Sequence, residues 1–178
     1  MAQFYPHSLS RHSVIGAELI SLAEAKLYLR VDHAEEDSLI AGFIQAAREY
    51  AEDTIKASLV QQQWKVTYNY EFPPVVHLPM GKVESVITIE LEDANGAITI
   101  LDTASFALNR TEKKVTFTNR VIGASLSIIY QTTSSSLIEE TLRQAMLGHI
   151  HALYEERGAA TVPASSRDIY HHYRKIVL

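Results

Sequence analysis

The spacing of apolar residues changes twice along the chain, and these changes constrain the fold most. Between residues 34 and 56 apolar side chains recur every three or four positions, a spacing that predicts a helix with one buried face. From residue 60 to 132, short segments alternate apolar and polar residues, as half-buried strands do. Residues 137–157 return to the helical spacing. We therefore expect an α+β fold, with an antiparallel β subdomain inserted into a helical body of two N-terminal helices and one long C-terminal helix.

Local signals place the element boundaries. Ser21 and Glu24 have the spacing of a capping box, which predicts a short helix over 22–31. Asn95-Gly96 lies between two apolar segments and favours a hairpin, because both residues tolerate positive φ. Strands are expected in QWKVTYNYEF, VESVITIELED, AITILD, SFALN, KVTFTN and SLSIIYQ, with at most an edge strand in FPPVVHLPMG. The expected divisions are an irregular arm (1–20), the first part of the helical body (21–59), the β subdomain (60–132), the C-terminal helix (133–158) and a tail (159–178).

Composition excludes several classes of function. The chain has no cysteine, so disulfides, thiol nucleophiles, zinc ribbons and iron-sulfur clusters are excluded. The apolar runs are too short to cross a bilayer, so we expect no membrane association. The N-terminus has no secretory signal pattern, so we expect the protein to assemble in the cytoplasm. The net charge of −5 divides into −4, −1 and 0 over residues 1–60, 61–132 and 133–178. No segment forms the basic cluster that tight binding to a phosphate backbone requires.

The stretch LRVDHAEEDSLI (29–40) concentrates His33 with four carboxylates, Asp32, Glu35, Glu36 and Asp37. These groups are candidates for a metal or acid/base site, but they crowd the start of one expected helix. Asp32 and Glu35 fit a second capping box, and carboxylates in the first turn are favoured by the helix dipole. We interpret the cluster as a helix start, with His33 exposed.

His149, His151 and Glu155 resemble a metal-binding triplet only in composition. Residues two apart on a helix point about 200° apart, so only His151 and Glu155 share a face. His149 lies on the apolar stripe and is expected to be a core or interface histidine with a hydrogen-bond partner. The sequence also has no nucleophile elbow and no glycine-rich phosphate loop, so we expect no catalysis, cofactor or metal.

The tail segment YHHYRK (170–175) is rich in the residue types found at protein-protein hot spots, and a docking role is one interpretation. A tail that packs on its own domain, or that is disordered, is the other. Because few periodic core positions follow Gly158, we expect a chain truncated there to fold as a monomer.

The order of segments resembles one family. ISLAEAKLYLRVDHAEEDSLIAGFIQAAREYAEDTI, QQQWKVTYNY, HLPMGKVESVITIELEDANG and LIEETLRQAMLGHIHALYEERGA, together covering about residues 20–158, resemble the head-tail connector (adaptor, or head-completion) proteins of long-tailed phages and prophages. The most telling pieces are LRVDHAEEDSLI, the LP-x-G-x-V-x-S-V run of Leu78–Val86, and HALYEERGA.

The resemblance implies a structural protein and not an enzyme. It implies a homo-oligomeric ring, usually of twelve copies, that lies under the portal at the head-tail junction of the virion. The ring would extend the DNA channel without sequence-specific contacts and would bind a tail or stopper protein on its other side. Residues 21–57 and 137–157 would build the ring body, and the strands from Val60 to Thr132 would face outwards or towards the tail. The resemblance makes the C-terminal segment a portal-binding element, with candidates Ile169, Tyr170, Tyr173, Arg174 and Lys175.

Two other classes stay open from the residues alone. A DNA-packaging or nucleic-acid-binding accessory protein would need basic side chains gathered by folding onto one surface. A small metal-dependent hydrolase would need ligands from the clusters around His33 or His149.

Overall fold

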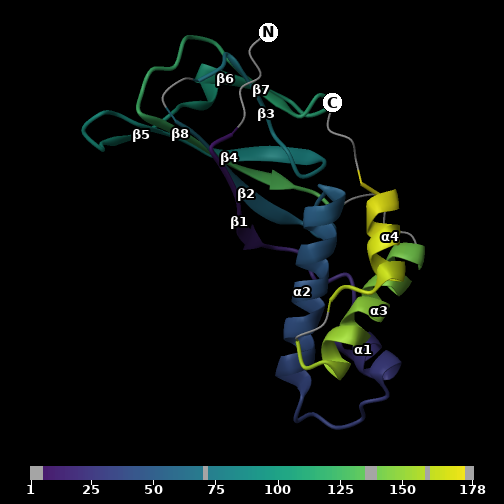
Figure 1. Cartoon of the computed structure of the whole chain (residues 1–178). Helices are drawn as coiled ribbons and strands as arrows, with labels where there is room; N and C mark the ends of the chain where they lie inside the picture. Colours follow the sequence, from purple (N-terminus) through teal and green to yellow (C-terminus); the bar gives the residue numbers. More distant parts are fainter. Residues whose placement is uncertain (1–5, 70–71, 135–139, 159–160, 175–178) are drawn as a thin grey trace. The chain divides into compact units, whose positions relative to one another are not determined.

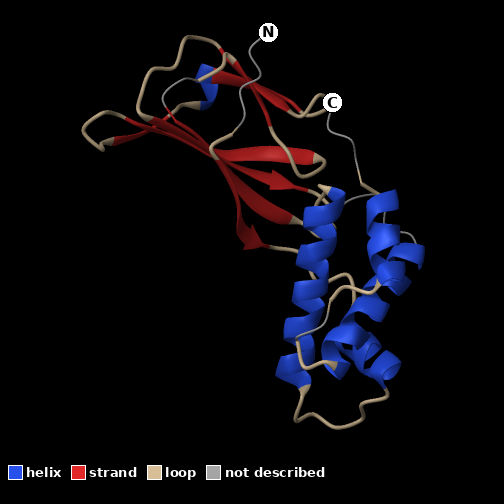
Figure 2. Ribbon diagram, viewed as in Figure 1, coloured by secondary structure: helices blue, strands red, loops and turns tan. Residues whose placement is uncertain are grey.

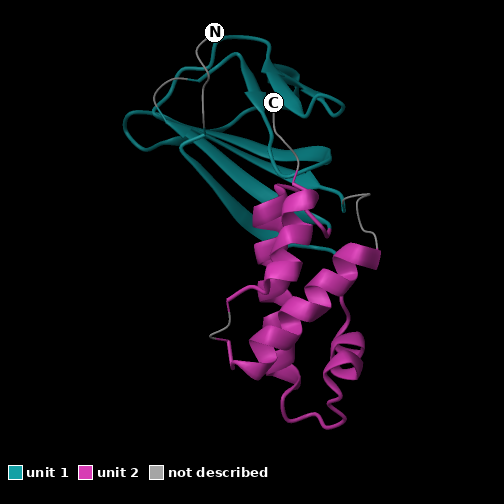
Figure 3. Cartoon of the chain, turned by 45° about the vertical axis from the view of Figure 1, so that its right-hand side comes forward, with its two compact units in different colours: residues 1–16, 61–134 teal, residues 17–60, 135–178 magenta. Residues whose placement is uncertain are grey.

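The computed structural model describes residues 6–69, 72–134, 140–158 and 161–174. The chain forms two compact units, each made of two separate stretches (Figure 3). Residues 1–16 and 61–134 form the β unit, and residues 17–60 and 135–178 form the helical unit. Helices and antiparallel sheets are both present, so the predicted α+β class is confirmed (Figure 2).

The β unit contains two antiparallel sheets (Figure 1). The larger sheet has the order β1-β2-β8-β4-β5, with β1 Ser8–Val14, β2 Gln62–Asn69, β8 Ser125–Thr132, β4 Val83–Glu92 and β5 Ile98–Ile100. The smaller sheet has the order β3-β7-β6, with β3 Val75–His77, β7 Lys114–Phe117 and β6 Phe106–Asn109, and a 3-10 turn at Thr103–Ser105 precedes β6. Strands therefore form in every segment where the alternating pattern predicts one.

Both sheets contribute to one core in the β unit. Alternate residues of β2, starting at Trp64, are buried together with residues of β8 and with Val115 of β7. The hydroxyl of buried Tyr130 donates to the carbonyl of Pro79 at 3.0 Å, so its burial leaves no unpaired polar group. Leu78 and Val83, from the LP-x-G-x-V-x-S-V run, are also in this core.

Strand β1 corrects the prediction of an irregular arm at the N-terminus. Ser8–Val14 pairs with β2 in antiparallel register and forms an edge of the larger sheet. Most of its side chains are exposed, so it carries no alternating apolar pattern that sequence reasoning could detect. The guanidinium of Arg11 lies over the ring of Trp64 at 4.9 Å and donates to Gln62 at 3.0 Å.

The hairpin predicted at Asn95-Gly96 joins β4 to β5. Gly96 has φ of 83°, and the carboxylate of Asp93 accepts hydrogen bonds from the backbone N–H groups of Asn95 and Ala97. The carboxylate thus provides hydrogen-bond acceptors for the backbone N–H groups of the turn, a common role of Asp side chains in tight turns.

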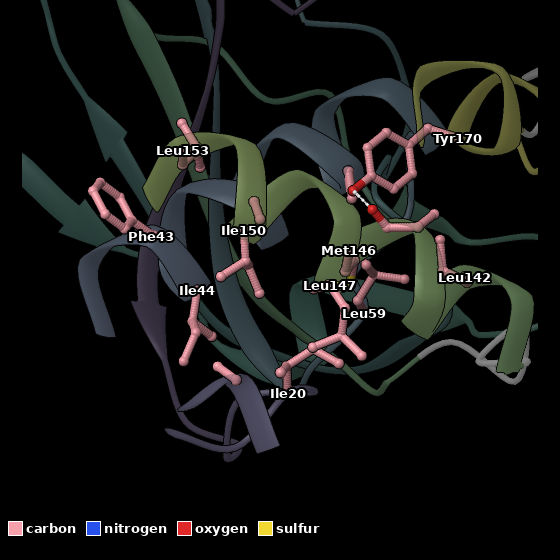
Figure 4. Packing of buried hydrophobic residues seen from close by; sticks show 14 of the residues in the cluster. Ile20, Phe43, Ile44, Leu59, Leu142, Met146, Leu147, Ile150, Leu153 and Tyr170 are labelled. Atoms are coloured by element: carbon pink, nitrogen blue, oxygen red, sulfur yellow. Dashed lines mark hydrogen bonds between the residues drawn. The ribbon is translucent and has the colours of Figure 1, made fainter. Parts of the chain in front are cut away.

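The helical unit contains α1 Leu22–Leu29, α2 Asp37–Ile55, α3 Glu140–Glu155 and α4 Ala164–His172 (Figure 1). Its core is formed by apolar residues from each of these helices, and Figure 4 shows members of this core from α2, α3 and α4, among them Ile44, Ile150 and Tyr170. The stripe predicted for the 34–56 helix supplies the α2 part of this core. Gly158, at φ 87°, donates its N–H to the carbonyl of Leu153 and so helps to end α3, as predicted.

The two predicted capping boxes have different outcomes. At α1 the hydroxyl of Ser21 accepts from the N–H of Glu24 at 3.2 Å, while the carboxylate of Glu24 is bound by Arg143 of α3 at 2.6 Å. The second box is wrong: α2 begins at Asp37, not near Ala34, and its N-cap residue makes no side-chain capping bond. The carboxylates there are instead used in tertiary contacts, described below.

Helix α4 corrects the expectation that truncation after Gly158 would remove little of the core. Tyr170 is fully buried in the helical core, and Ile169 and Tyr173 pack against it. The hydroxyl of Ser166 donates to the carbonyl of Ala145 at 2.8 Å. The helix starts three residues earlier than predicted, at Ala164, and removing it would expose the face of α3 that it covers.

Candidate interaction surfaces of the helical unit

The described residues contain no group of His, Asp and Glu side chains arranged to hold a metal ion. Among those same residues, no helix is both long enough and apolar enough to cross a membrane. His151 and Glu155 are neighbours at 3.9 Å, and both are largely exposed. His149, by contrast, is buried.

The stretch 29–40 joins three helices. Glu36 accepts hydrogen bonds from the hydroxyl of Tyr154 at 2.5 Å and from the guanidinium of Arg157 at 2.6 Å. These contacts lower the pKa of Glu36, the bond from Arg157 being the larger cause and that from Tyr154 the next. Tyr154 and Arg157 belong to HALYEERGA, so two of the sequence pieces that carried the resemblance contact each other.

The rest of the cluster holds the connection between α1 and α2. The ammonium group of Lys26 in α1 donates to the carbonyl of His33 at 2.6 Å and to the carboxylate of Asp37 at 2.5 Å. His33 is exposed, as predicted, and lies 2.9 Å from the carboxylate of Glu35. Lys26 and Asp37, together with Glu36, thus connect α1, α2 and α3.

Arg48 and Glu52 of α2 form an ion pair that sequence reasoning missed. Charged side chains that lie between the apolar positions of a helix are expected to face solvent, but Arg48 is 1% exposed and Glu52 0% exposed. Their charged groups are 2.9 Å apart, Glu18 accepts from Arg48 at 2.8 Å, and Glu52 also accepts from the N–H of Leu59 at 2.7 Å. Burial alone would lower the pKa of Arg48, but the hydrogen bond to Glu18 and the charge of Glu52 raise it above its ordinary value.

His149 is buried where α4 packs on α3, as its place on the apolar stripe predicted. Its Nδ1 lies 3.5 Å from the hydroxyl of Tyr170, which is itself 3.4 Å from the carbonyl of Ala145. The ring of Tyr50 meets the imidazole edge-on at 5.4 Å between centroids. Burial lowers the pKa of His149, which favours the neutral imidazole at neutral pH.

A shallow depression of about 500 Å³ lies beside this cluster, and we call it the α2–α3 groove. Its walls are Ala46 and Tyr50 of α2, His149 and Leu153 of α3, Thr161 and Val162 of the connection to α4, and Arg167 of α4. The lining is mostly apolar, with one guanidinium at the rim.

The portal-docking candidates have unlike positions. Tyr170 is fully buried, and Ile169 and Tyr173 are partly buried against the helical core. Arg174 is exposed, and Lys175 lies outside the described residues. Tyr170 therefore packs on its own unit, which is one of the two interpretations of the tail. The docking role of the other candidates stays a prediction.

Helix α1 exposes a second apolar surface, which we call the α1 patch: Ala23, Leu27 and Tyr28. Leu27 is 81% exposed and Tyr28 44% exposed. The ring of Tyr28 contacts the imidazole of His151 edge-on, with 6.2 Å between centroids. Sequence reasoning assigned α1 to the helical body without noticing that apolar residues occur on all of its sides.

Comparison with known proteins agrees with this architecture. Residues 19–99 match the model of the phage gp6-like head-tail connector protein family. The predicted resemblance to head-tail connectors is confirmed. The matched region runs from just before α1 to within β5, so it includes parts of both units. A comparison with curated protein sequences finds no match.

Chains in solved structures of gene transfer agent (GTA) particles share the fold over nearly the whole chain. A chain in the neck of an empty GTA particle, computed with C6 symmetry, is 21% identical with a TM-score of 0.70, and the match covers 96% of this chain and 97% of that one. A chain in the virion of a native gene transfer agent particle is 21% identical with a TM-score of 0.71, covering 96% of both. A chain in the native neck, computed with C12 symmetry, is 19% identical with a TM-score of 0.67, covering 96% and 97%.

The comparisons therefore support a structural connector role. They give no support to the alternative of a DNA-packaging or nucleic-acid-binding accessory protein.

Proposed function

We propose that this protein is a structural, non-enzymatic component of a virion neck, in which copies form a ring that joins head to tail. The observation that carries the proposal is the match of residues 19–99 to the connector family. It is supported by a fold shared along almost the full chain with proteins of GTA necks, which were computed with C6 and C12 symmetry.

The finer parts of the proposal follow from the family resemblance. The ring, of about twelve copies, binds beneath the portal, extends the DNA channel and offers its other side to a tail or stopper protein. Assembly takes place in the bacterial cytoplasm, and DNA passes without sequence-specific contact. The low content of clustered basic charge is consistent with a channel that does not hold the phosphate backbone. Arg174 and Lys175, with Ile169 and Tyr173, are the proposed portal contacts.

The proposal is tested by mixing the full chain with the portal protein of the same genome. We expect rings bound to portal assemblies in electron micrographs, and a matching multiple of the 19.9 kDa subunit by native mass spectrometry. A chain that stays monomeric and unbound with intact portal assemblies would contradict the proposal. Salt-sensitive binding of duplex DNA by the free chain would instead favour the nucleic-acid alternative.

A further inference from the structure

Helix α1 is too apolar for the position it occupies. Six of its eight residues are apolar, and they lie on every side of the helix. Such a helix is normally enclosed on all sides, whereas the outer face of α1 carries the exposed side chains of Leu27 and Tyr28. Scattered exposed apolar residues need no explanation, but adjacent ones on a helix of this composition indicate a missing partner.

The α2–α3 groove is a suitable receptor for these side chains. It is apolar and concave, and its volume of about 500 Å³ lies in the range of ~300–1,000 Å³ typical of binding pockets. Ala46 at its wall is exposed and small, so a large apolar side chain can approach the α2 backbone closely.

The patch and the groove lie on opposite sides of α3. Tyr28 contacts His151, whereas His149 lines the groove, and two residues this far apart on a helix point about 200° apart. The two surfaces therefore cannot meet within one chain. A head-to-tail ring requires two unlike, complementary surfaces on different sides of each subunit.

Charge also distinguishes the two sides. On the side of the α1 patch, the exposed carboxylate of Glu155 lies beside His151, which Tyr28 contacts, and exposed Arg30 and Glu35 follow α1 in the chain. The groove side carries Arg167 at its rim and His171 four residues later on the same exposed face of α4. Glu49, which precedes Tyr50 of the groove wall in α2, is already bound by Gln45 and Arg48. The guanidinium of Arg167 at the groove rim can therefore meet a carboxylate such as Glu155 of a neighbouring subunit, and opposite charges that meet across an interface favour correct pairing.

We propose that the α1 patch of one subunit inserts into the α2–α3 groove of the next subunit, and that this contact closes the ring. The inference rests on the proposed ring function and adds to it the two surfaces through which copies of this chain meet.

Paired substitutions test the contact. In Leu27→Asp the charge replaces a side chain that is 81% exposed, so the free subunit should keep its fold and its melting temperature. We expect it to lose rings on the portal. The matched control is Ile122→Asp, which changes another exposed apolar residue, 76% exposed, in the β unit and should leave ring formation unchanged.

Crosslinking gives a readout that does not depend on loss of function. The chain has no cysteine, so Leu27→Cys with Ala46→Cys introduces a single thiol on each surface. With portal present, a short bismaleimide should give a ladder of covalent oligomers from the double variant, whereas a mixture of the two single variants should stop at dimers. Ala46→Cys with Ile122→Cys should give no ladder.

The outcomes separate the two proposals. Absence of rings from the unsubstituted chain would overturn the connector function and this contact with it. Normal rings from Leu27→Asp, or rings of the double variant without a ladder, would overturn the contact and leave the function standing. Crosslinks from the thiol of the Ala46→Cys variant to the portal chain would show that a different protein occupies the groove, and would also overturn it.

Discussion

Arg48 and Glu52 place two opposite charges inside the helical unit, where neither can be hydrated. Their i,i+4 spacing continues the line of Ile44 along α2, so both side chains turn towards the core. Charged residues are rarely buried unless they are paired, and for this reason sequence reasoning expected them to face solvent. The i,i+4 spacing of Ile44, Arg48 and Glu52 indicates that all three share one face of α2. It does not by itself indicate that a charged pair lies on the buried face.

Neutralising Glu52 should therefore be costly. In Glu52→Gln the guanidinium of Arg48 keeps Glu18 and the more distant Glu49 as ionic partners among the described residues. Breaking a buried pair costs about 3–5 kcal/mol, and we expect the lower end because Glu18 remains. The measurement is the free energy of unfolding in urea, followed by circular dichroism at 222 nm. Glu49→Gln is the matched control: its side chain is 35% exposed, and it should cost at most about 1 kcal/mol. Equal losses in both variants would refute the argument.

At the scale of elements, the sequence predicted the helices and strands whose apolar residues recur at a regular spacing. Helix α2 has a buried stripe at helical spacing, strand β2 alternates between buried and half-buried positions, and both were found. Strand β1 was missed because an edge strand with exposed side chains is defined by its backbone hydrogen bonds to β2 and not by an apolar pattern. The start of α2 was misplaced because the carboxylates expected in its first turn have other partners: Glu36 is bound by Tyr154 and Arg157, more than 100 positions away in the sequence.

The same limit applies to the candidate surfaces. The exposure of Leu27 depends on where α3 covers α1, and the groove depends on the packing of α4, so neither could be predicted from local spacing. His149 was placed correctly in the core, but its contacts with Tyr50 and Tyr170 come from two other helices.

The packing of α4 on α3 should depend on pH through His149. Burial lowers the pKa of its imidazole below the ordinary value of about 6.5, so the unfolded chain binds the proton more readily than the folded one. Stability is therefore complete above about pH 6.5 and falls as the pH drops through the folded pKa. The measurement is the free energy of unfolding between about pH 7.5 and 5.

His149→Phe should flatten this dependence while keeping aromatic contact with Tyr50 and Tyr170. The exposed His151→Phe serves as the control and should retain the slope. A slope unchanged in His149→Phe would assign the pH dependence to other groups.

At the scale of the molecule, the two units have separate cores, and the chain offers a probe for each. The only tryptophan, Trp64, is buried in the β unit, whereas the α-helices of the described ranges, α1 to α4, belong to the helical unit. Tryptophan fluorescence therefore follows the β core, and circular dichroism at 222 nm follows chiefly the helical core. Because the core residues of each cluster come from one unit only, a defect in one core should leave the other folded.

Glu52→Gln should thus shift the 222 nm transition to lower urea concentration and leave the Trp64 transition in place. The reciprocal change is Val115→Ala, which removes two methyl groups from the β core and should move the fluorescence transition, by about 1–3 kcal/mol, more than the 222 nm transition. Transitions that move together in both variants would show that the units unfold as one cooperative block. Independent transitions would mean that the β unit can unfold while the helical unit, which carries both proposed ring surfaces, stays folded.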